Sequence, residues 1–134
     1  MKKKIIKGIL LDTTKNTIQE YDLNYKSYKD FYPILDCDCF DIATRKFGNH
    51  YIDIFCDDEG LLKVGLPMAV STSAEGKVVE QIVGNVFLCG HDEEGDSISL
   101  TKEEIEDVNK CIRYYYDTDN EGNDILRVCL VAEL

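Results

Sequence analysis

Residues 51–67, YIDIFCDDEGLLKVGLP, join the clearest strand pattern of the chain to its densest turn chemistry. Side chains alternate in character through the first six residues, which is the period of a β-strand. One face is apolar and is predicted to be core, whereas the other carries two aromatic rings and a carboxylate. We expect that second face to be covered by another element or to form the wall of a pocket. The apolar face holds Ile52, Ile54 and Cys56, and the mixed face holds Tyr51, Asp53 and Phe55.

The residues after this strand predict turns. Asp57-Asp58-Glu59-Gly60 ends the strand, because Asp tolerates turn geometry and Gly adopts positive φ without a Cβ clash. Leu61 and Leu62 are expected to return to the core, and Gly65-Leu66-Pro67 predicts a second bend.

Neighbouring segments supply partners for the strand. Residues 38–47 predict a strand that returns through a Gly48-Asn49 turn to form a central hairpin. The first hairpin is predicted from residues 4–11 and 17–23, and the last from residues 114–118 and 125–134. Residues 86–89 read as a short buried strand, 90–96 as an acidic loop, 68–77 as a surface loop, and 78–83 as either strand or short helix.

Two helices are predicted. The first is predicted to be capped by Asn24 or Ser27 and to end at Pro33. Its aromatic stripe is expected to be mostly core-facing and consists of Tyr25, Tyr28, Phe31 and Tyr32. The second begins at a capping box, in which Thr101 serves the amide of Glu104 and the Glu104 side chain reaches back. Its inner face is predicted to hold Ile105, Val108 and Ile112.

These elements predict an α+β fold, an antiparallel sheet built from hairpins with one or two short helices packed on one face. With 134 residues the chain is predicted to be a single domain, residues 1–134, large enough for a proper core.

The charge of the chain limits its partners. The formal net charge is −11, from 26 acidic and 15 basic residues, so a nucleic-acid polymer would be repelled. Residues 1–12, MKKKIIKGILLD, do not read as a secretory signal, and no stretch reaches the roughly 20 apolar residues that cross a membrane. We therefore expect a soluble, cytoplasmic protein with no membrane partner.

The six cysteines are interpreted as reduced and mostly buried thiols, since a secreted context is not expected. A zinc site from Cys37, Cys39, Cys89 and His91, with His50 and Cys56, is the alternative, but the spacing does not suit the common zinc motifs. Residues 117–122 resemble the opening of a calcium loop, yet the twelfth position is the apolar Val128. We expect no metal and no cofactor.

Catalysis has candidates without a recognisable arrangement. Asp53, Asp57, Asp58 and Glu59 are of the type that holds magnesium, and Asp57 with Asp58 of the type that acts as a base, but turn formation explains them equally well. No nucleophile elbow or phosphate-binding glycine motif occurs. The sequence is therefore interpreted as that of a non-enzyme.

Arginine beside aromatic rings is the composition of a nucleotide pocket. Arg45 precedes the mixed face of the 51–56 strand, and Arg113 stands next to Tyr114. The predicted ligand-binding residues are Arg45, Tyr51, Asp53, Phe55, Arg113 and Tyr114. Ion pairing is the alternative role of these arginines.

Four short motifs occur in this order: DDEGLL at 57–62, GLP at 65–67, IVGNVF at 82–87 and SLTKEEI at 99–105. Through these motifs, the segment from about Asp36 to Val108 resembles a family of small domains of unknown function carried by phages and other mobile elements of low-GC bacteria.

The resemblance implies an accessory protein in the cytoplasm of a bacterial host. Its first expected role is to sequester a small nucleotide immune signal, a relative of cyclic ADP-ribose or a cyclic oligonucleotide, in pockets of a homo-oligomer. The alternative is an acidic mimic of DNA, or another protein-binding inhibitor of a restriction or defence protein. A structural or regulatory module without a ligand is the third possibility.

Overall fold

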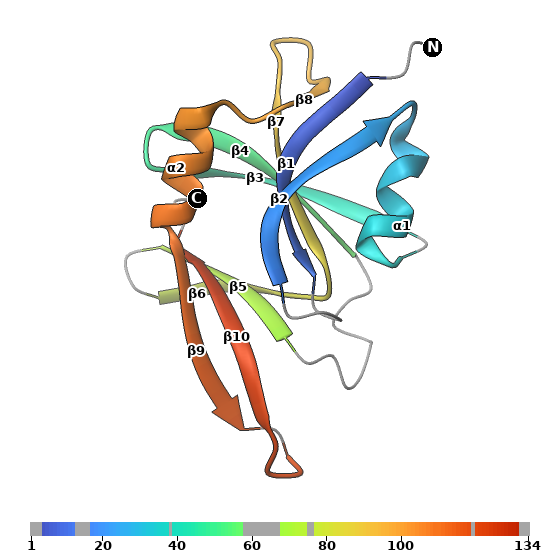
Figure 1. Cartoon of the computed structure of the whole chain (residues 1–134). Helices are drawn as coiled ribbons and strands as arrows, with labels where there is room; N and C mark the ends of the chain where they lie inside the picture. Colours follow the sequence, from blue (N-terminus) through green and yellow to red (C-terminus); the bar gives the residue numbers. More distant parts are fainter. Residues whose placement is uncertain are drawn as a thin grey trace.

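The chain forms two β-sheets with two short α-helices in the part that is described (Figure 1). The computed structural model describes residues 4–12, 17–37, 39–57, 68–74, 77–118 and 120–131. The first sheet has six strands in the order β2-β1-β7-β4-β3, with β8 paired to β7; the second has four, in the order β6-β5-β10-β9. The strands are β1 (Lys4–Asp12), β2 (Thr17–Tyr25), β3 (Phe40–Phe47), β4 (His50–Asp57), β5 (Met68–Ala74), β6 (Lys77–Val83), β7 (Val86–His91), β8 (Ser97–Ile98), β9 (Ile112–Thr118) and β10 (Asp124–Val131).

The three predicted hairpins are present. β1 pairs antiparallel with β2, β3 with β4, and β9 with β10. Only Gly48 and Asn49 separate β3 from β4, and Gly48 has a φ of 61°, a conformation that glycine adopts without a Cβ clash. The turn therefore sets the register of the central hairpin, in which Phe47 faces His50.

The prediction of a surface loop at residues 68–77 is wrong. Met68–Ala74 is strand β5, which lies between β6 and β10 and pairs in parallel with β10. Its serines and threonines suggested a loop, but pairing with a strand more than 50 residues further along the chain decides the structure. Such pairing overrides local composition, because strand propensity depends on context. The segment 78–83, ambiguous from its sequence, belongs to strand β6.

The first helical segment begins at the second of the two predicted caps and runs past its predicted end. Ser27 caps a 3₁₀ turn, Tyr28–Asp30, which continues into helix α1, Phe31–Leu35. Pro33 was expected to end the helix but lies inside it. A proline is tolerated in the first turn, where its missing N–H has no partner to lose. The helix ends at Asp36, whose φ of 52° and ψ of 54° are left-handed.

The second helix confirms the predicted capping box. Helix α2 spans Lys102–Lys110; the Thr101 hydroxyl accepts a hydrogen bond from the Glu104 amide at 3.1 Å, and the Thr101 amide donates to the Glu104 carboxylate at 2.8 Å. Val108 is fully buried as expected. Ile112 is buried too, but as the first residue of β9 rather than as part of the helix. No helix among the described residues is long and apolar enough to cross a membrane.

The α+β class with antiparallel strands is confirmed, but the helices cover opposite faces of the six-stranded sheet instead of one (Figure 1). We call these the α1 face and the α2 face. On the α2 face, Val108 and residues of the second sheet complete an aliphatic cluster with Ile52, Ile54 and Leu88. On the α1 face, Phe31 and Leu35 of α1 pack on a cluster formed by Ile6, Leu10, Leu23, Phe55, Phe87 and Cys89.

Candidate functional site

The register of the central hairpin separates Arg45 from the residues it was predicted to join. Arg45 faces Ile52 across the hairpin, so its side chain is on the α2 face of the sheet. Tyr51, Asp53 and Phe55 alternate with Ile52 and are on the α1 face. The predicted combination of this arginine with that wall is therefore wrong. The two-residue Gly48-Asn49 turn could have predicted this, because it fixes which residues of β3 and β4 are opposite each other.

Phe55 is a core residue and not the wall of an open pocket. Its side chain is 2% exposed and stacks on Phe31 of α1, with ring centroids 4.1 Å apart and an interplanar angle of 13°. Phe40 and Phe87 surround the same ring cluster. A ligand would have to displace α1 to touch Phe55. Tyr51, two residues from Asp53 on the same strand face, is exposed.

Arg113 and Tyr114 belong to the other sheet, on strand β9. The Arg113 guanidinium donates hydrogen bonds to the carbonyl oxygens of Lys110 and Ile112, and Tyr114 is exposed. The arginine thus caps the end of α2, where cations are favourable beside the last carbonyl groups. The six predicted residues are spread over two faces and two sheets and do not form one site.

The Asp53 carboxylate on β4 contacts side chains of both neighbouring strands. The Thr44 hydroxyl of β3 donates a 2.6 Å hydrogen bond to its carboxylate, and His91 Nδ1 of β7 lies 3.1 Å from the same oxygen. The His91 approach lacks the angle of a well-formed hydrogen bond, so that contact is chiefly electrostatic. The Asp53 carboxylate is therefore buried and in contact with Thr44 and His91, and it is not available to bind a ligand.

Cys89 faces Asp53 across the β4–β7 pair, which places a thiol, a carboxylate and an imidazole near one another. This combination of groups suggests a cysteine nucleophile, but the environment has the opposite effect. Burial, followed by the charge of Asp53, raises the pKa of the Cys89 thiol to about 12. The thiolate is the reactive form of cysteine, so Cys89 is held in its unreactive state at neutral pH.

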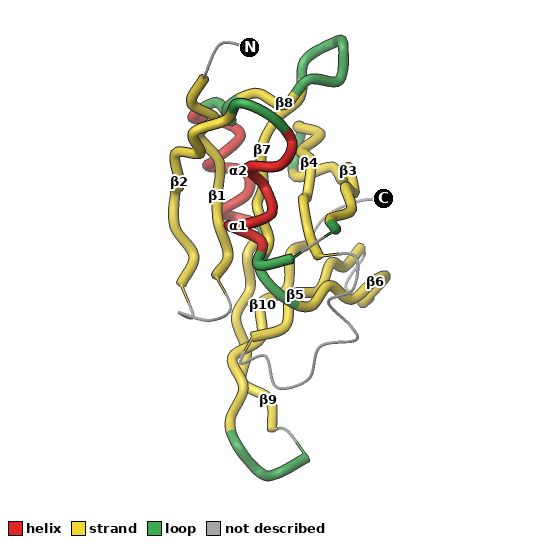
Figure 2. The backbone as a smooth tube through the Cα atoms, turned by 90° about the vertical axis from the view of Figure 1, so that its right-hand side faces the viewer, coloured by secondary structure: helices red, strands yellow, loops and turns green. Residues whose placement is uncertain are grey.

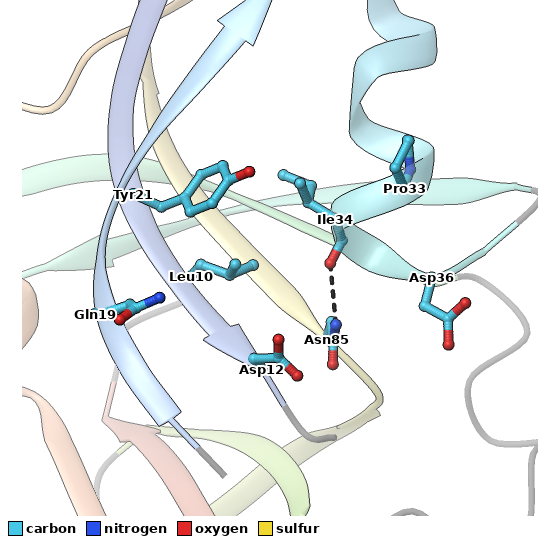
Figure 3. Close-up of a pocket in the computed structure, with 8 residues that line it drawn as sticks. All are labelled: Leu10, Asp12, Gln19, Tyr21, Pro33, Ile34, Asp36 and Asn85. Atoms are coloured by element: carbon cyan, nitrogen blue, oxygen red, sulfur yellow. Dashed lines mark hydrogen bonds between the residues drawn. The ribbon is translucent and has the colours of Figure 1, made fainter. Parts of the chain in front are cut away.

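A cavity of about 290 Å³ opens between the β1–β2 hairpin and the end of α1 (Figure 3). We call it the hairpin pocket. Its lining residues come from β1, from β2, from α1 and its C-cap, and from the segment that precedes β7. Its lining consists of Leu10, Asp12, Gln19, Tyr21, Pro33, Ile34, Asp36 and Asn85.

Local structure explains how these side chains converge. Leu10 and Asp12 alternate onto the same face of β1, and their partners in the hairpin register are Gln19 and Thr17. Asn85 is 7% exposed, and its amide donates a 3.0 Å hydrogen bond to the carbonyl oxygen of Ile34, as Figure 3 shows. That carbonyl is in the last turn of α1, where carbonyl groups lack helical partners. Asn85 thus fastens the helix to the sheet beside the pocket.

The lining is polar and acidic. Leu10 and Asn85 are the buried members, Asp12, Tyr21 and Ile34 are partly exposed, and Gln19, Pro33 and Asp36 are at the solvent side. Two carboxylates and two amides surround one phenol, and the described residues of the lining include no lysine or arginine. The pocket is suited to hold a small group through hydrogen bonds.

The sequence interpretation missed this pocket. It ended the first strand at residue 11, began the short buried strand at residue 86 and placed the end of the helix at Pro33. One available signal was the polar Asn85 directly before an apolar strand, since a buried amide needs a hydrogen-bond partner. The partner, a carbonyl 51 residues earlier, is not readable from sequence.

The candidate metal ligands do not assemble among the residues that the structure describes. No three of their histidine, cysteine, aspartate and glutamate side chains are placed to hold one ion. Five cysteines are thiols and not disulfides, of which Cys56 and Cys89 are buried and Cys39 is exposed: Cys37, Cys39, Cys56, Cys89 and Cys111. Asp58 and Glu59, suggested as magnesium ligands with Asp53 and Asp57, lie outside the described residues. So do Asp119 of the calcium-like segment, the predicted core residues Leu61 and Leu62, and the predicted bend at 65–67.

A second carboxylate–imidazole pair joins the central hairpin to α2. His50 Nδ1 lies 2.6 Å from the Asp107 carboxylate. The hydrogen bond from His50 lowers the pKa of Asp107 below its usual value, with smaller help from the Asn49 backbone and Lys110. This pair is on the α2 face of the sheet and contributes to packing rather than to the pocket.

The family model described as "Domain of unknown function (DUF3846)" matches residues 6–113. The chain belongs to this family. The match is wider than the resemblance seen at 36–108 and includes β1, β2 and α1, the elements of the hairpin pocket. It ends at Arg113, so most of β9 and all of β10 lie beyond it. Neither the curated proteins nor the solved structures contain a match to the chain.

Proposed function

We propose that the protein is a non-enzymatic, phage-type accessory protein that sequesters a small nucleotide immune signal in the cytoplasm of a bacterial host. The observation that carries the proposal is the hairpin pocket, a cavity of about 290 Å³ with amide, carboxylate and phenol groups around it. Small-molecule sites are typically roughly 300–1,000 Å³ in volume. The pocket is at the lower end of that range, so it accommodates part of a dinucleotide and not the whole.

The nucleoside is the part that suits the lining. Carboxylates such as Asp12 and Asp36 accept hydrogen bonds from ribose hydroxyl groups, as acidic residues do in dinucleotide sites. Gln19 and Asn85 carry amides of the kind that pair with base edges, and Tyr21 offers an aromatic ring. Phosphate groups are proposed to remain in solvent, because the described residues of the lining carry two carboxylates and no basic side chain.

The chemistry of Cys89, the cysteine that could act as a nucleophile, favours a binding role without catalysis. The Cys89 thiol faces Asp53 and has a pKa of about 12. Cys89 lies four residues along the chain from Asn85 of the pocket. Four residues of strand correspond to roughly 13 Å, so this thiol is remote from the pocket. The polar groups that the described residues bring to the pocket are carboxylates, amides and a phenol, with no thiol or imidazole among them.

A direct test is a thermal-shift and native mass-spectrometry screen. The protein would be purified from phage-infected bacteria and from uninfected bacteria, and the released small molecules identified. The proposal predicts a retained nucleotide, with one ligand per chain, and the same spectra report whether the protein is a homo-oligomer. Absence of any nucleotide under both conditions, together with no shift by added nucleotides, would refute it.

The second candidate is an acidic inhibitor of a DNA-binding defence protein, and the β9–β10 hairpin favours it. This hairpin extends beyond the six-stranded sheet (Figure 2) and exposes Tyr114 and Tyr116, the latter 77% accessible. Glu121 in its turn and Asp124 at the start of β10 are exposed. Aromatic rings beside carboxylates suit a basic protein surface. Salt-sensitive capture of a DNA-binding host protein, lost in the Tyr114→Ala/Tyr116→Ala variant, would support this role.

A further inference from the structure

Among the strands that the structure describes, β9 is at one end of the four-stranded sheet, in the order β6-β5-β10-β9 (Figure 1). A strand in that position directs one row of backbone amide and carbonyl groups away from its sheet, and this row is a template for pairing with another strand. Proteins commonly protect such an edge with charged residues or proline. The middle of β9, Tyr114-Tyr115-Tyr116, contains neither.

The edge of the six-stranded sheet at β3 is different. The Ile42 amide donates a 2.9 Å hydrogen bond to the Asp41 carboxylate, and the Arg45 guanidinium donates a 2.9 Å hydrogen bond to the Thr44 carbonyl oxygen. Side chains of β3 thus occupy backbone groups of their own edge strand, which discourages pairing with another strand. The β3 edge is protected by its own sequence, whereas the middle of β9 is composed of tyrosines.

Two aromatic rings are exposed on one face of β9. Tyr114 is 59% and Tyr116 is 77% accessible, and residues two apart on a strand share a face. Ile112, on the same face, is buried in the aliphatic cluster of the α2 face. The apolar face of β9 therefore continues from the core into solvent, where the hairpin extends beyond the six-stranded sheet (Figure 2). Exposed aromatic residues grouped in this way are typical of an interaction surface.

The order of residues in β9 is self-complementary. Tyr115 is the central residue of the strand; Tyr114 and Tyr116 flank it, and Arg113 and Asp117 follow one position further out. In an antiparallel pair of two β9 strands centred on Tyr115, each Tyr114 is opposite a Tyr116, and each arginine is opposite an aspartate. Aromatic pairs and opposite charges across two strands both stabilise the pairing. This match favours a second copy of the chain as the partner.

We propose that two copies of this chain associate through β9, antiparallel and about a two-fold axis at Tyr115, so that their four-stranded sheets join into one. The proposal goes beyond the proposed function and does not depend on the hairpin pocket. One strand pair with two symmetrical aromatic pairs is smaller than a standard protein interface. The expected dimer is therefore reversible, with a Kd of roughly 1–100 µM.

Cysteine cross-linking tests the register. Opposite residues of an antiparallel pair have Cα atoms about 4.5–5.5 Å apart, within the range of about 4.4–6.8 Å that a disulfide needs. The background is Cys39→Ser, which removes an exposed native thiol. Tyr115→Cys should give a covalent dimer on mild oxidation, as should an equimolar mixture of Tyr114→Cys and Tyr116→Cys. Each of the latter two alone should cross-link at least roughly tenfold less, because its thiols are not opposite each other.

Analytical ultracentrifugation of the purified chain, at roughly 1–200 µM, measures the association. Tyr114→Thr/Tyr116→Thr removes both rings and keeps strand propensity, and it should raise the Kd at least roughly tenfold. Tyr51→Thr, at an exposed strand tyrosine of the other sheet, is the matched control and should keep the wild-type Kd. Circular dichroism confirms that each variant is folded. Arg113 is left unchanged, because its guanidinium also bonds to carbonyl oxygens at the end of α2.

Four outcomes would overturn the proposal. They are a wild type that stays monomeric throughout this range, a dimer equally strong in the double threonine variant, cross-linking that is equal at all three positions, and assembly that continues past the dimer, since a two-fold contact is closed. A monomer that uses Tyr114 and Tyr116 to capture a DNA-binding host protein would also contradict the dimer and would support the second candidate function. A nucleotide retained by a monomer would leave the proposed function standing and refute the dimer.

Discussion

The two faces of the six-stranded sheet are covered to different extents. The α2 face is closed by a nine-residue helix and by the second sheet, whose Val128 and Leu130 are fully buried in its aliphatic cluster. The α1 face is covered by a five-residue helix, only about 7.5 Å long. Five neighbouring strands span roughly 19 Å between the outer two. A helix this short cannot close such a face, and the hairpin pocket is at its edge (Figure 3).

The side chains follow this difference. The α2 face is filled mainly by branched aliphatic residues, whereas Phe31, Phe55 and Phe87 dominate beneath α1. Aromatic rings let one short helix bury a large area, because each covers about 150–250 Å². The remaining surface of the α1 face is polar, with Asp53 and His91 along one part and the pocket residues along another. Function is therefore expected on the less completely covered face.

The largest expected effect comes from loosening α1. Phe31 is 1% exposed and stacks on Phe55, so Phe31→Ala should lower the free energy of unfolding by about 3–5 kcal/mol, from lost burial and the cavity left behind. Ligand binding to the hairpin pocket should fall as well. Tyr28→Ala, at an exposed position of the same segment, should cost less than about 1 kcal/mol. Urea denaturation measures both; equal losses would mean that α1 is not held by Phe31.

The next effect tests the close approach of β1 to β7. A Cβ on Gly8 would lie 2.3 Å from the Leu88 carbonyl oxygen and 2.5 Å from the Phe87 ring. Gly8→Ala should therefore destabilise the protein by about 1–3 kcal/mol through overpacking. Gly90→Ala, whose added Cβ would meet its nearest atom at 3.3 Å, is the milder comparison. Thermal unfolding that is unchanged in Gly8→Ala would contradict the packing of Phe87 across this strand.

The α1 face should also protect its thiol. Because the pKa of Cys89 is raised to about 12, its thiolate is scarce at pH 8, and alkylation should be at least tenfold slower than at the exposed Cys39. The raised pKa also means that folding stability is intact below the unfolded thiol pKa near 9 and declines as pH rises from there toward 12. Site-resolved mass spectrometry after timed iodoacetamide labelling measures the rates. Equal labelling of both thiols in the folded protein would show that this part of the face opens readily.

The smallest effect concerns the His50–Asp107 pair on the α2 face. Hydrogen bonding from His50 lowers the pKa of Asp107, so the pair stabilises the folded state above the unfolded pKa of 3.8 and loses that contribution as pH falls below it. Asp107→Asn should weaken the protein slightly at neutral pH and flatten the loss of stability as the pH falls below the unfolded pKa of 3.8. Glu106→Gln, exposed on the same helix, should retain the wild-type pH dependence. Chemical denaturation from neutral to acidic pH measures the free energy of unfolding of the three proteins.

Much of the fold could be predicted because its signals are local. The Gly48-Asn49 turn, the alternation in residues 51–56 and the Thr101–Glu104 capping box each depend on atoms within a few residues, and each is present. The site was predicted poorly because it depends on register and on distant contacts. Arg45 was assigned to the wrong face although the turn fixed its register, and Phe55 was predicted as a pocket wall because alternation alone does not show what covers a face.

Sequence alone determined the hairpins, the start of α2, the acidic net charge and the motifs that identify the family. All of these depend on short stretches of sequence or on composition. Tertiary structure decided the parallel pairing of β5 with β10, the placement of the helices on opposite faces and the pocket between β1, β2 and α1. The reason is physical: these features arise from contacts between segments tens of residues apart, such as Asn85 with Ile34. Their energies depend on which surfaces meet, and a local pattern does not specify its partner.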